Sequence, residues 1–352
     1  MLIFLDDFIY SLQSIGGVSV YWTSVLEEIH ESKKPNIFLI RAKENKNILA
    51  QKRKWGFQSL NELRLPLGIS RILFKSLPAK SIFHSSYLRI SLQRSICNVI
   101  TIHDLAAELG YLKGIRGRVK KELQAFAIRH ADGIICVSEA TKKSLLVHYP
   151  QISDNKIQVI HHGCSDIFRP IDDHKHKNII LFVGHRKLYK NFDICVQILE
   201  KLPQYELLII SGEKFSTLEY KALKNRLGNR FRHIENVDTA TLNNYYNDAF
   251  CLLYSSCYEG FGMPVLEAMK AGCPVIASDI PALREVAADG AILIEDFLNA
   301  EAYIKPILDL KNQQIRKELI DKGVKRAESF SWKKHIELQF SFYNKTYRQR
   351  FG

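Results

Sequence analysis

Two glutamates, Glu259 and Glu267, stand on either side of the segment Gly-Phe-Gly-Met-Pro. Pro264 suits the first position of a helix, so we expect a helix to begin near Met263 and to end at about 270–272. Ionised carboxylates accept hydrogen bonds at both oxygens, which lets them hold the neighbouring hydroxyl groups of a ribose or a hexose. The pair could therefore hold two sugar rings of one extended ligand. Taken alone, Glu267 is better explained as a partner of the helix dipole.

The loop before this helix favours an anion. Gly260 and Gly262 free the backbone to take positive φ and bring bare amides close to a ligand, and the N–H groups of a helix start suit a phosphate. Earlier in the chain, FVGHRKLYKNF carries Arg186 and Lys190. The Arg186 guanidinium could bind a diphosphate through paired N–H donors, and the Lys190 ammonium could bind it as a point charge. The spacing is not that of a P-loop, and two cations in a loop are by themselves more often solvated than functional.

Two further segments carry weaker signals. In SLQSIGGVSVYW, Gly16 and Gly17 precede an apolar helix, although a Gly-Gly pair alone indicates only a turn. In TIHDLAAE, His103 and Asp104 end an apolar run, and a lone histidine there is more often structural than ligand-binding. Asp104 could orient His103 or cap the next helix.

These residues follow short apolar runs that alternate with helical segments. The runs are predicted to be strands at Leu2–Leu5, Asn36–Ile40, Ser81–Ser86, Asn98–Asp104, Gly133–Ser138, Ile157–Gly163, Ile179–Gly184, Glu206–Gly212, Phe231–Val237, Phe250–Ser256 and Pro274–Ser278. Nearly continuous apolar strands are typical of a parallel sheet covered on both faces. The alternation occurs twice, on either side of the polar segment Ser165–Asn178. This order predicts an α/β fold with two doubly wound Rossmann-like domains, residues 1–165 and 176–333, and a ligand site in the cleft between them.

The run YEGFGMPVLEA resembles the glutamate-x7-glutamate motif of the retaining glycosyltransferase family 4, whose members have the two-domain GT-B fold. The resemblance covers nearly the whole chain. It implies that Glu259 approaches the transferred sugar and that Glu267 binds the ribose hydroxyls of a nucleoside diphosphate sugar. It also implies that backbone groups face the sugar and phosphates at Gly260, Phe261, Gly262 and Met263.

The same resemblance gives roles to the other candidates. Arg186 and Lys190 match the family's phosphate-binding cations, and Gly16 and Gly17 match a glycine loop beside the donor phosphates or the acceptor. His103 matches a histidine near the transferred sugar, where we expect a hydrogen bond to a hydroxyl rather than general-base catalysis. The segments FHSSYLR and CVSEATKKSL resemble members from bacterial surface-polysaccharide assembly, with Ser138 and Thr141 as helix caps. The tail resembles the last GT-B helix, at about 334–352, which crosses back to the first domain.

Composition limits the remaining possibilities. The chain has 352 residues, enough for two domains, and no apolar run approaches the roughly 20 residues that span a bilayer. The N-terminus lacks the basic start of a secretory signal. The seven cysteines are scattered without metal-ligand spacing, which indicates reduced packing residues in a cytoplasmic protein.

The chain has a net charge of +13. Its Lys and Arg residues gather in two stretches that also carry apolar residues, Gln51–Lys80 and Tyr111–His130. The first includes Trp55, Phe57, Leu65, Leu67, Ile72 and Leu73, and the second includes Leu112, Ile115 and Val119. Basic and apolar groups together suit an anionic membrane surface. Solvated helix faces are the alternative explanation, and the chain shows no nucleic-acid-binding signature.

The sequence therefore predicts a cytoplasmic, metal-independent hexosyltransferase without a cofactor, peripheral at the inner face of a membrane. Its donor would be a UDP- or GDP-sugar, mannosyl donors included, and its acceptor a saccharide or polyprenyl-linked glycan of surface polysaccharide or lipopolysaccharide biosynthesis. No Asp-x-Asp metal–nucleotide motif occurs. Two alternatives stay open: a GT-B phosphorylase or epimerase-like enzyme, and a non-catalytic protein that binds sugar nucleotides.

Overall fold

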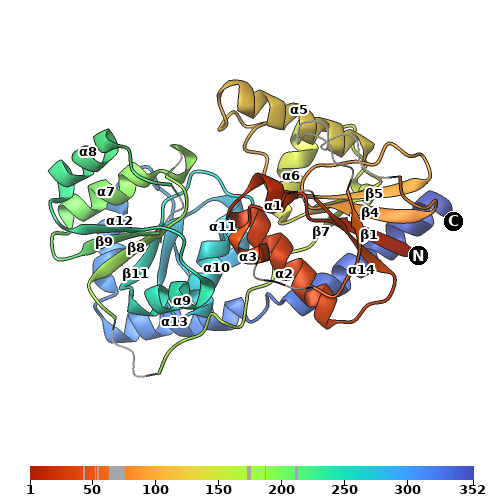
Figure 1. Ribbon diagram of the computed structural model, residues 1–352. Coiled ribbons are helices and arrows are strands. Elements are labelled where there is room, and N and C mark those ends of the chain that lie inside the picture. Colours follow the sequence, from red (N-terminus) through yellow and green to blue (C-terminus); the bar gives the residue numbers. More distant parts are fainter. Residues whose placement is uncertain are drawn as a thin grey trace. The chain divides into compact units, whose positions relative to one another are not determined.

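The computed structural model describes residues 1–42, 44–51, 53, 55–62, 76–172, 176–186, 188–210 and 213–352. The chain forms two compact units (Figure 1). The first comprises Met1–Gly163 together with Trp332–Gly352, and the second comprises Cys164–Ser331. The segment expected to be a linker before residue 176 thus begins the second unit, and the chain returns to the first unit at Trp332.

The strands of the first unit form one parallel sheet in the order β3-β2-β1-β4-β5-β6-β7. The strands are β1 Leu2–Asp6, β2 Ile37–Arg41, β3 Gln58–Asn61, β4 Ser81–Ser85, β5 Ile96–Ile102, β6 Gly133–Cys136 and β7 Ile157–Val159. The helices are α1 Ile9–Leu12, α2 Gly17–Glu31, α3 Ile48–Gln51, α5 Gly114–His130, α6 Glu139–His148, the short 3-10 helix η1 Asp154–Lys156, and α14 Trp332–Phe351.

The second unit repeats this plan with the order β10-β9-β8-β11-β12-β13, again parallel throughout. The strands are β8 Ile179–Val183, β9 Glu206–Ile210, β10 Phe231–Ile234, β11 Cys251–Tyr254, β12 Val275–Ser278 and β13 Ile292–Ile294. The helices are η2 Leu188–Lys190, α7 Phe192–Lys201, α8 Thr217–Leu227, α9 Thr239–Asp248, α10 Met263–Lys270, α11 Pro281–Ala287, α12 Glu301–Asp309 and α13 Gln313–Ala327.

The predicted α/β architecture is confirmed, and each predicted strand overlaps an observed one. Two edge strands, β3 and β13, were not predicted. β3 has the sequence QSLN and is mostly exposed, so it lacks the apolar signal of a buried strand. β13 has only three residues, too few to give a period.

Both sheets contain a point at which the strand order reverses. In the first unit the reversal lies between β1 and β4, and in the second it lies between β8 and β11. Loops that leave two such strands at their carboxyl ends diverge to opposite faces of the sheet and leave room for a ligand. Residues directly after these four strands are therefore the first candidates for a site.

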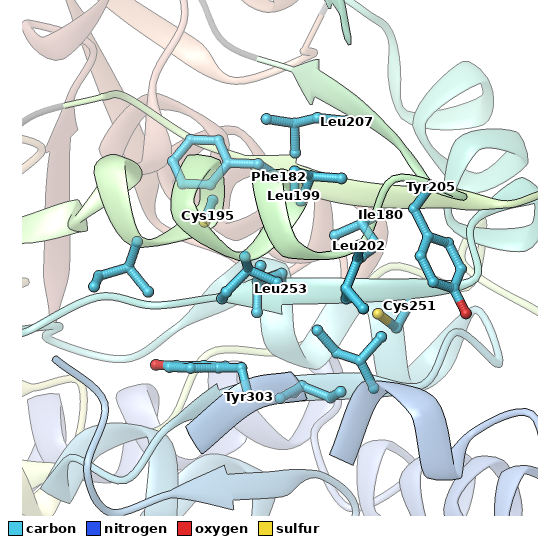
Figure 2. Close-up of a cluster of buried hydrophobic side chains, with 14 of the residues drawn as sticks. Ile180, Phe182, Cys195, Leu199, Leu202, Tyr205, Leu207, Cys251, Leu253 and Tyr303 are labelled. Atoms are coloured by element: carbon cyan, nitrogen blue, oxygen red, sulfur yellow. The ribbon is translucent and has the colours of Figure 1, made fainter. Parts of the chain in front are cut away.

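The core of the second unit is built mainly from α7 packed on β8, β9 and β11. Figure 2 shows Cys195 and Leu199 of α7 among Ile180, Phe182 and Leu253 of the strands. These side chains are 0–1% exposed, and burial of one such aliphatic or aromatic side chain contributes roughly 1.5–3 kcal/mol. All seven cysteines are free thiols, and all except the partly buried Cys257 lie in the protein interior.

Helix α14 packs on the first unit, against α2 and strands β4 to β6. Its entry requires a close backbone approach: a Cβ on Gly163 would lie 2.3 Å from the Trp332 nitrogen. Tyr343 of α14 hydrogen-bonds His84 of β4 at 2.5 Å, and His335 bonds the His161 carbonyl at 2.7 Å. Buried hydrogen bonds of this kind fix the position of a helix, in addition to the packing of its apolar side chains.

Candidate functional site

Lys190 and Glu259 meet at the strand-order reversal of the second unit. Lys190 ends the turn after β8, and Glu259 lies in the loop after the neighbouring strand β11. Because the two strands are parallel, both loops leave the same edge of the sheet. The Cys257 amide donates to the Tyr189 carbonyl at 2.7 Å and ties one loop to the other.

The Lys190 ammonium has two partners. It donates to Glu259 Oε1 at 2.6 Å and to the Tyr254 hydroxyl at 2.8 Å. The Lys190 and Glu259 side chains are only 12% and 10% exposed. Because desolvation offsets much of the attraction within such a pair, a binding role explains its position better than a contribution to stability. The structure thus brings together Lys190, the predicted phosphate-binding cation, and Glu259, the residue predicted to approach the transferred sugar.

Helix α10 begins at Met263, as the sequence predicts, and no side chain caps it. Gly262 adopts φ +106°, and a Cβ there would lie 2.5 Å from Leu283 Cδ2, so this position needs glycine. The same prediction for Gly260 is wrong, because it does not adopt positive φ. Phe261 anchors the loop through its buried ring, 5.9 Å from that of Phe330.

Glu267 lies in the second turn of α10 and is 8% exposed. The Tyr246 hydroxyl of α9 donates to Glu267 Oε2 at 3.0 Å. Burial raises the pKa of Glu267 to about 7, and the bond from Tyr246 acts to lower it. A carboxylate this buried is poorly placed as an ordinary helix-dipole partner.

Arg186 follows β8 but does not join the Lys190–Glu259 pair through any described contact. Its guanidinium donates to the backbone carbonyls of Glu213 at 2.8 Å and Lys214 at 3.0 Å. It also stacks on the Phe215 ring, with 3.8 Å between Cζ and the ring centroid. Phosphate contact by Arg186 therefore stays a prediction.

Sequence reasoning missed two tyrosines at this site, Tyr246 and Tyr254. Both are essentially fully buried, and each bonds a predicted site residue. The segment YYNDAFCLLYSS contains both, but its apolar character points to core packing. Only the pairing of α9 and β11 with the α10 region gives their hydroxyls polar partners.

In the first unit His103 follows β5 and packs against aromatic rings. Its ring centroid lies 4.7 Å from that of Tyr21 and 5.8 Å from that of His162. Burial lowers the pKa of His103 to about 4, so the ring is neutral near pH 7. A neutral ring can hydrogen-bond a sugar hydroxyl, as predicted, but carries no charge for a phosphate.

Asp104 is bound by α5 rather than by His103. Its Oδ1 accepts from Lys120 Nζ at 3.0 Å and from the Ala106 amide at 3.1 Å. Gln124 of α5 also donates to the Asp104 carbonyl at 2.8 Å. The predicted helix-capping role is wrong, because the next helix, α5, begins at Gly114 with Lys113 in its cap position, and no described hydrogen bond joins Asp104 to His103.

His103 belongs to a group of histidines, which we call the histidine cluster: His84, His103, His162 and His335. His103 is partly exposed, and the other three are buried. The Tyr21 hydroxyl links two members of the cluster. It lies 3.3 Å from His335 Nε2 and 3.4 Å from Thr101 Oγ1, and Thr101 Oγ1 in turn lies 3.0 Å from His84 Nε2. Burial lowers the pKa to about 3 for His84 and to about 4 for His335. The cluster is therefore held neutral at physiological pH.

The predicted glycine loop starts α2, with Gly16 in the cap position and Gly17 as the first helical residue. The Gly16 carbonyl accepts from Ser19 Oγ at 2.9 Å. Ser138 caps α6 as predicted, because its hydroxyl accepts from the Thr141 amide at 2.9 Å.

The strand-order reversal of the first unit is filled by a buried charge cluster. Arg89 donates to Asp6 Oδ2 at 3.2 Å and also pairs with Glu62, and these three side chains are 1–2% exposed. The Ser86 amide donates to Asp6 Oδ1 at 2.8 Å. The protein itself satisfies these charges.

The two basic stretches differ. Trp55 is buried and stacks on Tyr10 with 6.0 Å between ring centroids, so its expected membrane exposure is wrong. Trp55 is instead a buried residue that packs on Tyr10 of α1. Leu65, Leu67, Ile72 and Leu73 lie outside the described residues. In contrast, Ile115 and Val119 of α5 are 79% and 49% exposed.

Among the described residues, no group of three or more His, Cys, Asp or Glu side chains could hold a metal ion. No helix in the described ranges is both long and apolar enough to cross a membrane.

Comparison with known proteins covers both units. Residues 15–166 match the family model Glycosyltransferase Family 4, and residues 165–326 match Glycosyl transferases group 1. An uncharacterized glycosyltransferase of Methanocaldococcus jannaschii is 30% identical over 248 residues, 69% of this chain and 66% of that protein. An O-antigen chain mannosyltransferase of Salmonella typhimurium is 26% identical over 227 residues, 60% and 61% of the two chains. The chain thus spans about two thirds or less of these relatives.

Solved structures give the fold. Sucrose-phosphate synthase from Thermosynechococcus elongatus superimposes with a TM-score of 0.79 at 18% identity, over 99% of both chains. WaaG, a glycosyltransferase involved in lipopolysaccharide biosynthesis, superimposes with a TM-score of 0.66 at 13% identity, over 100% of both chains. The predicted GT-B architecture and the predicted enzyme class are confirmed. The chain belongs to the GT-B glycosyltransferases, with a family 4 first half and a group 1 second half.

Proposed function

We propose that this protein moves a hexosyl unit from a nucleoside diphosphate sugar to a saccharide or lipid-linked saccharide of cell-surface polysaccharide biosynthesis. The observation that carries the proposal is the 2.6 Å contact between Lys190 and Glu259 at the β8–β11 reversal. A cation for phosphate and a carboxylate for sugar hydroxyls stand there side by side. The mannosyltransferase among the relatives makes a mannosyl donor the first to try.

Each residue has a role in this proposal. Lys190 and the first amides of α10, at Gly262 and Met263, bind the diphosphate. Glu259 accepts from the hydroxyls of the transferred sugar, and Glu267 accepts from those of the ribose. Arg186 supplies a second cation once a phosphate competes for its guanidinium.

Two contributions come from the first unit in this proposal. Gly16 and Gly17 let the start of α2 approach the donor phosphates or the acceptor. His103 donates or accepts one hydrogen bond at a sugar hydroxyl as a neutral ring. Neither role needs a charged side chain.

The chemistry requires stabilisation of a departing diphosphate. The bond between the sugar C1 and a phosphate oxygen breaks, and a bond from C1 to the acceptor oxygen forms on the same face. Because the new bond forms on the face from which the phosphate departs, the configuration at C1 is retained, and the acceptor proton passes to the departing phosphate oxygen. Lys190, Arg186 and the helix-start amides stabilise the charge that develops on the phosphate, a task for which we propose no metal ion.

A thermal-shift screen across UDP- and GDP-sugars tests the donor, followed by linkage analysis of the product. We expect stabilisation by one sugar nucleotide and release of the free nucleoside diphosphate with acceptor. Activity that disappears with a chelator would exclude the metal-independent mechanism. Release of inorganic phosphate, or an isomerised donor, would favour the phosphorylase or epimerase alternative, and binding without turnover would favour a non-catalytic protein.

We also propose that α5 binds the anionic inner face of a membrane, where a lipid-linked acceptor would lie. Ile115 and Val119 are one helical turn apart and exposed, and Lys113, Arg118 and Lys121 beside them are exposed cations. Such a surface adsorbs through charge and inserts its apolar groups. Co-sedimentation with phosphatidylglycerol vesicles should fall in I115S/V119S, whereas L218S, at an equally exposed site of α8, should bind normally. Binding independent of anionic lipid would contradict the proposal.

A further inference from the structure

Tyr246 is a buried residue whose only described polar contact is with Glu267, a predicted donor-binding residue. It lies on α9 with 0% exposure, and its hydroxyl donates to Glu267 Oε2 at 3.0 Å. Its ring packs edge-on against Phe168, with 5.8 Å between centroids. Packing therefore fixes the ring, and the ring directs the hydroxyl to the carboxylate.

The direction of this hydrogen bond follows from the environment. Burial raises the pKa of Tyr246 well above its ordinary value, so the phenol keeps its proton. Tyr254 of β11 and Cys164 also lie within electrostatic range of Glu267, and burial raises the pKa of both, so they stay neutral. On its own helix, Lys270 is engaged elsewhere, by Asp166 at 2.6 Å and by the Cys164 carbonyl. Tyr246 is thus the side chain that stabilises the ionised form of Glu267.

Ionisation matters for the role proposed for Glu267. An ionised carboxylate accepts at both oxygens, whereas a protonated one must donate at one of them. With one oxygen held by Tyr246, the other is left for the hydroxyls of a ribose. Loss of the phenol would leave a carboxyl that is both freer to rotate and more protonated near pH 7.

We propose that Tyr246 is a positioning residue for donor binding, which holds one oxygen of Glu267 and keeps that side chain ionised for the ribose hydroxyls. This inference rests on the proposed function, because it takes a nucleoside diphosphate as the ligand. It adds a residue from α9, outside the glutamate motif itself.

The test compares the affinities of UDP and GDP with those of their 2′,3′-dideoxy forms by titration calorimetry between pH 6 and 8.5. For Tyr246→Phe we expect about tenfold weaker binding of the ribonucleotide at pH 7, the size of one hydrogen bond to a charged group. The dideoxy form should bind both proteins equally. The ribose-dependent part of the affinity should rise with pH through a midpoint near 7 in the unsubstituted protein, and at a higher pH in the variant.

Tyr303→Phe is the matched control. Tyr303 is equally buried in the same unit, and its hydroxyl bonds Ser278 at 3.3 Å and the Phe297 carbonyl at 3.2 Å. Its loss should change nucleotide affinity less than twofold. In a Glu267→Gln background, Tyr246→Phe should cause no further loss, because the charge that it stabilises is absent.

The outcomes separate the two proposals. If the protein binds UDP or GDP but Tyr246→Phe weakens both nucleotide forms alike, the positioning role is wrong and the proposed function stands. If neither nucleotide nor any sugar nucleotide binds, the proposed function and this inference both fail. Should the variant not fold, the unsubstituted protein decides: a ribose-dependent affinity that is flat between pH 6 and 8.5 overturns the inference.

Discussion

The two sheets place opposite charges at equivalent points, with different consequences. At the reversal of the first unit, Arg89 lies between Asp6 and Glu62, and these side chains are 1–2% exposed. At the reversal of the second unit, Lys190 and Glu259 are 12% and 10% exposed beside the uncapped start of α10.

The comparison shows that topology provides a position but not a function. A strand-order reversal leaves room at the carboxyl edge of a sheet, and a protein can fill that room or keep it for a ligand. In the first unit, Arg89 is further enclosed by the Phe8 ring, 4.5 Å from its Cζ. The charges there are used internally, whereas those of the second unit stay within reach of solvent.

Arg89→Met gives the largest expected effect. It leaves Asp6 and Glu62 as buried carboxylates without their cation, which costs about 3–5 kcal/mol of folding free energy. All three tryptophans, Trp22, Trp55 and Trp332, lie in the first unit, so tryptophan fluorescence during urea unfolding measures this loss. A change below about 1 kcal/mol would show that the cluster is not structural.

Lys190→Met tests the other reversal. We expect turnover to fall by about 10²–10³-fold, the effect of removing one preorganised group that stabilises developing charge, with the hydrogen exchange of second-unit peptides unchanged. Lys177→Met is the control, since the Lys177 pair with Asp248 is 61% exposed on the lysine side. Near-normal turnover of Lys190→Met would remove the contrast between the two reversals.

Acid should affect the histidine cluster of the first unit. The folded-state pKa values of His103 and His335 are about 4, below the ordinary 6.5. Their contribution to stability is complete above about pH 6.5 and is lost as the pH falls toward 4, about 3 kcal/mol each. Asp7 offsets part of this loss, because burial raises its pKa to about 7.

His335→Gln provides the measurement of this effect. Glutamine keeps hydrogen-bonding capacity toward Gln339 and the His161 carbonyl but cannot be protonated. The fluorescence-monitored unfolding free energy should therefore fall less steeply between pH 6.5 and 5 in the variant. Parallel pH profiles for the two proteins would contradict the assignment.

Glu267→Gln should show the opposite pH dependence in the second unit. The pKa of Glu267 is raised to about 7 from 4.5, so its contribution is complete below about pH 4.5 and is lost as the pH rises through 7. The variant should be more stable at pH 8 by up to about 3 kcal/mol and unchanged at pH 4.5. Hydrogen exchange of α9 and α10 peptides measures it, and a destabilised variant at pH 8 would refute the buried-charge explanation.

Tyr254→Phe gives the smallest effect. The Tyr254 hydroxyl lies 2.8 Å from Lys190 Nζ, and a hydrogen bond to a charged group contributes about 1.5–3 kcal/mol. Turnover should fall about tenfold, which is a smaller loss than in Lys190→Met. Tyr254→Leu also lacks the hydroxyl and should not restore turnover. Equal turnover in Tyr254→Phe and the unsubstituted protein would show that Glu259 alone positions the lysine.

The sequence by itself determined the architecture and much of the candidate site. Continuous apolar runs identified the parallel strands, because both faces of each strand are buried, and Pro264 located the start of α10. The types of Lys190, Glu259 and Glu267 indicated phosphate and sugar chemistry. The edge strand β3 was not predicted, because an exposed strand lacks the continuous apolar residues on which strand prediction depends.

Only the tertiary structure decided which groups act together. Lys190 and Glu259 are 69 residues apart and meet because β8 and β11 are neighbours, a pairing that no local pattern encodes. Tyr246 and Trp55 look alike in sequence as apolar aromatic residues, yet one hydroxyl reaches a buried carboxylate while the other ring packs in a core. The burial that sets the pKa of Glu267 and of the histidine cluster depends on long-range packing, which is why the sequence did not reveal it.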